Sequence, residues 1–193
     1  MEHQTDRHLG TRTVGERLTT GWCWRLLIVP ILGLSLLMGI VGRAQAQLLG
    51  EEAELDRLRA KAEDAMGNDD AEGAAMNMGR AALMAAQLGK RQIEPALRQA
   101  FKATEHLYRS QEHGYRGLAL FRRAGGELPA SAGVCGSLQL AQLELQHTQE
   151  SLAQSVTPDR PDAASPRLPA IRQTTDDWAI VLSSMQGEFR CPN

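Results

Sequence analysis

The sequence predicts an all-α protein, either an irregular helical bundle or a short array of helical hairpins. After residue 46, apolar residues recur at steps of three, four and seven, which is the period of an amphipathic helix. No segment keeps the period-two alternation that is typical of a strand, and the gaps between apolar stripes carry glycine or proline. With 193 residues, 42% hydrophobic and 23% charged, the chain suits one folded domain with added segments.

The first of these segments is residues 1–46, which have the layout of a secretory signal. Residues 26–41 form an apolar run that follows Arg25, and the small-x-small sequence Ala44-Gln45-Ala46 comes after it. We expect cleavage after Ala46 or, if the segment is uncleaved, a membrane anchor through residues 26–41. Both readings place residues 47 onward in the periplasm or the secreted medium, anchored in the inner membrane in the second case.

Residues 47–155 are predicted to form the helical domain, which begins with two helices. Apolar residues share one face of the first helix, which ends at Gly67: Leu48, Leu55, Leu58, Ala62 and Ala65. Asp69 and Glu72 have capping-box spacing for the second helix, over about 70–88. This second helix is rich in alanine and methionine, so we expect a neighbouring helix to pack closely against it.

Three more helices are expected in the same domain. The first begins near Pro95 and ends at Gly114, with a stripe of Ile93, Leu97, Ala100, Phe101, Thr104, Leu107 and Tyr108. A short helix over 115–124 follows. A long helix over 132–154 then carries a seam of Val134, Leu138, Ala141, Leu145, Thr148 and Leu152.

Two predicted helix pairs, over 71–113 and 115–154, each span about 40 residues, a length similar to that of helical-hairpin repeats such as tetratricopeptide repeats. Met78-Gly79 with Ala82 resembles the start of that motif, but the later alanine and phenylalanine positions of the motif fall on Arg91 and Pro95. The match covers about one helix, so no family is assigned.

The composition changes after residue 155. Residues 156–175 contain Pro158, Pro161, Pro166 and Pro169, which predicts an extended linker. Residues 176–193 then predict an amphipathic helix with Trp178, Val181, Leu182, Met185 and Phe189 on one face. A helix this short is marginal alone in water, so this face must dock on its own domain, on a partner or on a membrane.

Cysteine usage predicts one disulfide. Cys23 precedes the apolar run and leaves with the signal, so Cys135 and Cys191 are the pair that reaches an oxidising compartment. A disulfide between them would latch the terminal helix onto the domain, whereas free thiols would favour a tethered helix that binds a partner.

Candidate chemistry is sparse, and we expect no enzyme, no cofactor and no metal site. His106 and His113 share a helix face but lie about 10.5 Å apart along the axis. Met76 and Met78 point to different sides of one helix, so they cannot both bind one ion. No nucleophile with its base and no phosphate-binding glycine loop is present.

These observations predict an exported, non-catalytic protein that binds another protein, as a scaffold or accessory subunit at the periplasmic side of a membrane. The partner could belong to a membrane complex. With 21 Lys and Arg against 23 Asp and Glu, the net charge of −2 does not favour nucleic acid. The alternative is a small periplasmic carrier of metal or haem that uses Met78 and His106 or His147 as ligands.

Overall fold

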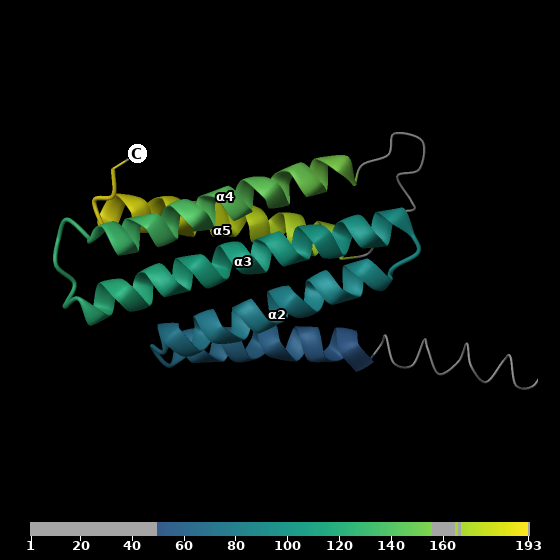
Figure 1. The fold of residues 1–193 in the computed structure, drawn as a ribbon, viewed down its shortest axis with the longest axis horizontal. Coiled ribbons are helices and arrows are strands. Elements are labelled where there is room, and N and C mark those ends of the chain that lie inside the picture. The colour runs from purple at the N-terminus through teal and green to yellow at the C-terminus, as the bar shows by residue number, and fades with distance from the viewer. Residues whose placement is uncertain (1–49, 156–164, 166, 193) are drawn as a thin grey trace, which may run out of the picture. The chain divides into compact units, whose positions relative to one another are not determined.

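The computed structural model describes residues 50–155, 165 and 167–192, and every regular element in that part of the chain is a helix. A helix over residues 50–67 is followed by α2 (Ala71–Arg91), α3 (Pro95–Arg123), α4 (Ala132–Gln154) and α5 (Leu168–Glu188) (Figure 1). The all-α prediction is therefore confirmed. The expected signal or anchor segment and half of the predicted linker of residues 156–175, with three of its four prolines, lie outside the described residues. None of the described helices has the length and hydropathy that a membrane span requires.

Helix α3 is the central element of the bundle. It packs against α2 on one side and against α4 on the other, and α5 lies against α4 and α3 (Figure 1). The helix of residues 50–67 contributes Leu55, Leu58 and Ala62 to the same buried core. Helix α2 buries mostly alanine, which lets its backbone approach its neighbours closely.

The turn before α2 corrects one predicted cap. The side chain of Asp70, not of Asp69, accepts a hydrogen bond of 2.8 Å from the backbone N–H of Gly73. Asp69 instead takes up a left-handed backbone conformation, with φ of 64°, where the chain reverses direction. Aspartate tolerates this conformation better than most residues. The turn at Asp69 places Asp70 at the N-cap position of α2.

Helix α3 runs through Gly114, where the sequence predicted a break between two helices. A Cβ atom at position 114 would lie 2.5 Å from Cζ2 of Trp178, so glycine serves close approach of α5 rather than helix termination. At the other end, Ile93 was expected in the buried stripe but is 92% exposed. It precedes the first helical residue, Pro95, so the helical period does not yet apply to it.

Helix α5 begins eight residues earlier than predicted, within the expected linker. Pro169 occupies the first turn, where a proline costs no helical hydrogen bond because that N–H has no partner in the helix. Arg167, just before the helix, pairs with Glu52 at 2.9 Å and Asp56 at 3.4 Å. Its guanidinium also lies 5.7 Å from the centre of the Phe101 ring. The start of α5 is thus held against the first helix of the domain.

The rest of α5 is docked on α3 and α4. The indole Nε1 of Trp178 donates a hydrogen bond of 2.8 Å to Oγ of Ser110, and Phe189 stacks on Phe121 with ring centres 4.1 Å apart. Cys135 and Cys191 form the predicted disulfide, with Cα atoms 5.4 Å apart. The sequence left open a terminal helix latched by a disulfide and a tethered helix with free thiols. The structure has the latched helix.

Candidate functional site

A groove of about 670 Å³ runs between α2 and α3 on the side away from the core. Its apolar floor contains two large hydrophobic side chains that the fold leaves in solvent, Met76 at 61% and Leu83 at 55% exposure. Small residues line the floor between them, Ala75, Gly79 and Ala119, and the carboxyl group of Glu112 lies over Gly79. The exposed Met76 and the buried Met78 confirm that these two methionines face different sides of α2.

Charged side chains, most of them basic, form the rim of this groove. Four arginines line it, Arg80, Arg109, Arg116 and Arg123, together with Glu72 and Glu112. Arg109 pairs with Glu105 at 3.1 Å, Arg116 pairs with Glu112, and Arg123 pairs with Glu72. Four arginines against two glutamates give the groove lining a formal excess of positive charge, although three of the four arginines are paired with glutamates.

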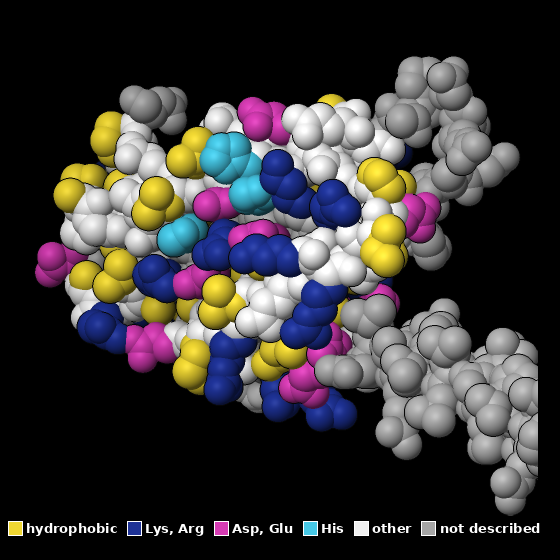
Figure 2. All heavy atoms as spheres, turned by 45° about the vertical axis from the view of Figure 1, so that its right-hand side comes forward, with side chains coloured by type: hydrophobic (Ala, Val, Ile, Leu, Met, Phe, Trp, Pro, Cys, Tyr) yellow, Lys and Arg dark blue, Asp and Glu magenta, His cyan; other side chains and the backbone are white. Residues whose placement is uncertain are grey.

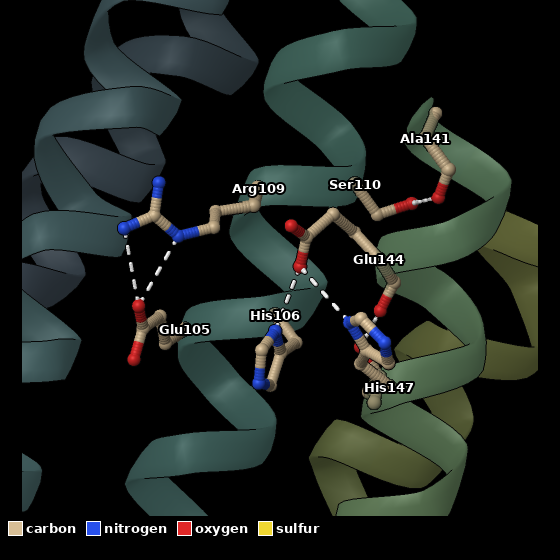
Figure 3. A network of polar contacts seen from close by, with 8 residues as sticks. Glu105, His106, Arg109, Ser110, Ala141, Glu144 and His147 are labelled. Atoms are coloured by element: carbon tan, nitrogen blue, oxygen red, sulfur yellow. Dashed lines mark hydrogen bonds and ion pairs between the residues drawn. The ribbon is translucent and has the colours of Figure 1, made fainter. Parts of the chain in front are cut away.

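A second polar feature lies between α3 and α4, where His106, Glu144 and His147 meet. The three side chains each offer a ligating atom, and these atoms lie within 4.8 Å of one another. Figure 3 shows both imidazole rings turned toward the same carboxylate. Nδ1 of His106 donates a hydrogen bond of 2.7 Å to Oε2 of Glu144, and Nδ1 of His147 is 3.9 Å from that oxygen. The two rings also make an edge contact, with centres 5.1 Å apart.

Local helix geometry explains how this cluster forms. Glu144 and His147 are three residues apart on α4 and therefore lie on the same face. His106 faces them from α3, and one turn along that helix Oγ of Ser110 donates a buried hydrogen bond of 2.6 Å to the backbone oxygen of Ala141. The indole of Trp178 also donates a hydrogen bond to this hydroxyl. These two hydrogen bonds fix the distance between α3 and α4 next to the cluster.

His113, the other histidine that the sequence placed near His106, is not part of the cluster. Its Nδ1 atom is buried and has no hydrogen-bond partner among the described residues. Burial lowers the pKa of His113, although the neighbouring Glu112 acts in the opposite direction. Burial likewise raises the pKa of Tyr108, to about 12, so both side chains are neutral near pH 7.

Most of the residues predicted to bind a partner are buried in the chain's own core. Trp178, Leu182 and Phe189 are at most 6% exposed, and Met185 packs against them. Val181 is the exception, at 45% exposure, beside Ile180 at 71%. The apolar face of the terminal helix is thus packed mainly within the domain, with Val181 still accessible to solvent.

The two sites identified in the structure had only partial signals in the sequence. The Glu144-x-x-His147 spacing was available from the sequence, but its pairing with His106 required the register of α3 against α4. Met78, the methionine in the carrier alternative, is 1% exposed within the core.

On the face of the molecule in Figure 2, histidines lie among basic and acidic side chains.

Comparison with models of protein families, with curated proteins and with solved structures finds no match to this chain.

Proposed function

We propose that this chain is an exported, non-catalytic binding protein whose α2–α3 groove holds an amphipathic helix of a partner protein. The observation that carries the proposal is the groove itself, with Met76 and Leu83 exposed on its floor. Large apolar side chains in a concave, solvent-facing position are typical of helix-in-groove recognition.

Charge and length define the chemistry of the partner helix. The groove lining on α2 extends from Glu72 to Leu83, about 16 Å at 1.5 Å per residue, which matches three turns of a docked helix. The arginine-rich rim favours acidic residues beside the apolar stripe of that helix. Arg80, which is exposed on the rim, is well placed to pair with such a residue.

The disulfide supports the extracytoplasmic part of the proposal. Disulfides persist in secreted and periplasmic proteins and are rare where thiols are kept reduced. Cys135 and Cys191 are joined in this fold. With the predicted signal or anchor in residues 1–46, the chain would act as a scaffold or accessory subunit at the periplasmic side of a membrane.

Photo-crosslinking in the source organism tests the groove. A benzoylphenylalanine replaces Leu83 in the full chain, and the crosslinked product is digested and sequenced by mass spectrometry. We expect a protein adduct that maps to an amphipathic segment with Asp or Glu flanking its apolar stripe. A synthetic peptide of that segment should bind the wild type at least tenfold more tightly than Leu83→Asp, a difference of about 1.4 kcal/mol.

Ile180 provides the matched control, because it is an apolar residue at 71% exposure on a different helix. The same crosslinker at position 180 should not give this adduct, and Ile180→Asp should not weaken the peptide. Arg80→Glu should weaken it, and added salt should reduce the contribution of the arginines. Equal crosslinking at both positions, or adducts only with lipid or with a second copy of the chain, would contradict the proposal.

A further inference from the structure

We propose that His106, Glu144 and His147 form a binding site for a zinc ion that bridges α3 and α4. This inference goes beyond the proposed groove and does not depend on it, because the two sites use different residues. The donors are two imidazole nitrogens and one carboxylate oxygen, a set that binds zinc in proteins when three protein ligands leave one position open.

The ligating atoms of the cluster lie near the separations that a bound ion requires. A tetrahedral zinc ion with bonds of about 2.0–2.1 Å holds its ligating atoms about 3.3 Å apart. The Glu144 oxygen is 2.7 Å from the His106 nitrogen and 3.9 Å from the His147 nitrogen, values on either side of that separation. At 3.9 Å the second contact is too long for a hydrogen bond, so a proton satisfies only one of the two histidines.

The helices hold the ligands close to the arrangement that the ion needs. Glu144 and His147 come from one face of α4, and the Ser110–Ala141 hydrogen bond of 2.6 Å sets the distance to α3 one turn away. Binding the ion requires the side chains of His106, Glu144 and His147 to rotate until their ligating atoms lie about 3.3 Å apart. Sites built on packed helices keep their ligands in place better than sites on loops.

The exposure of the three side chains leaves the fourth coordination position of the ion open to solvent. The His147 side chain is 41% exposed, whereas those of His106 and Glu144 are 20% and 21% exposed. Water, or a ligand from a bound partner, can therefore reach the ion. Iron(II) binds the same donor types, but zinc has no redox chemistry and suits the oxidising compartment predicted for this chain.

Isothermal titration calorimetry of the chelator-treated full-length protein with zinc chloride tests the site. We expect one saturable binding event and no comparable event with magnesium, which prefers oxygen ligands. His147→Ala should weaken zinc binding at least tenfold. This variant is the most informative, because the His147 side chain is partly exposed and its removal leaves the His106–Glu144 hydrogen bond in place.

Glu144→Gln, which keeps the shape of the side chain but removes its charge, should weaken zinc as well. His113→Ala is the matched control and should bind zinc like the wild type, since His113 lies outside the cluster. Cobalt(II) absorption gives an independent readout, with a visible band expected for the wild type and its loss in His147→Ala. No saturable zinc binding, or equal binding by the wild type and His147→Ala, would overturn the proposal.

Discussion

Gly114 determines how closely α5 can approach α3. The position faces the Trp178 ring, whose Cζ2 atom would lie 2.5 Å from an added Cβ. The ring cannot easily move away, because its Nε1 is hydrogen-bonded to Ser110. It also makes an edge contact with the Tyr115 ring, with the two ring centres 5.4 Å apart. A side chain at position 114 would therefore strain the contact between the two helices.

We expect Gly114→Ala to reduce the free energy of unfolding by about 1–2 kcal/mol. Overpacking a well-filled contact costs about 1–3 kcal/mol, and the better helix propensity of alanine offsets up to about 1 kcal/mol. Urea unfolding monitored by circular dichroism measures the difference.

Gly136→Ala is the control, because Gly136 lies inside α4 and an added Cβ would meet no atom within 4 Å. This change should leave the stability unchanged or raise it by up to about 1 kcal/mol. If both substitutions had the same effect, the close contact at Gly114 would not be what requires glycine there.

At the scale of elements, α5 is fastened at both ends. Arg167 ties its start to Glu52 and Asp56, and the Cys135–Cys191 disulfide ties the residues after its end to the start of α4. The backbone N–H of Ala130 also donates a hydrogen bond of 2.9 Å to the carbonyl of Phe189. These contacts make α5 part of the bundle that supports both proposed sites.

Removing the disulfide should therefore destabilise the domain and loosen the end of α5. The bond closes a loop with a sequence separation of 56, which corresponds to about 4 kcal/mol in the chain-entropy model. We expect the double variant Cys135→Ala, Cys191→Ala to unfold at lower urea concentration, with faster amide exchange near Phe189. Cys23→Ala serves as the control and should change neither quantity, and unchanged unfolding of the double variant would contradict the latch.

At the scale of the whole molecule, the proposed function requires that residues 47–193 leave the cytoplasm. An alkaline phosphatase fused after Asn193 should be active in a bacterial host, because that enzyme folds only where its disulfides can form. Deleting residues 26–41 should abolish the activity. A full-length fusion that is inactive, while a cytosolic reporter at the same position is active, would contradict export.

The sequence by itself determined the helical class, most helix positions and the cysteine pair. Helical periodicity is a local property, since residues three and four apart share a face whatever they pack against. The stripe of Val134, Leu138 and Ala141 is accordingly buried as expected. The disulfide followed from counting the cysteines that remain after the predicted signal.

Only the tertiary structure decided which faces meet. Gly114 resembles a helix boundary in sequence and Pro169 a linker residue, but Gly114 accommodates Trp178 and Pro169 fits the first turn of α5. The cluster of His106 with Glu144 and His147 depends on the register between α3 and α4, and the groove depends on what α2 and α3 leave uncovered. These features join residues far apart in the chain, and the local period of a helix does not specify its neighbour.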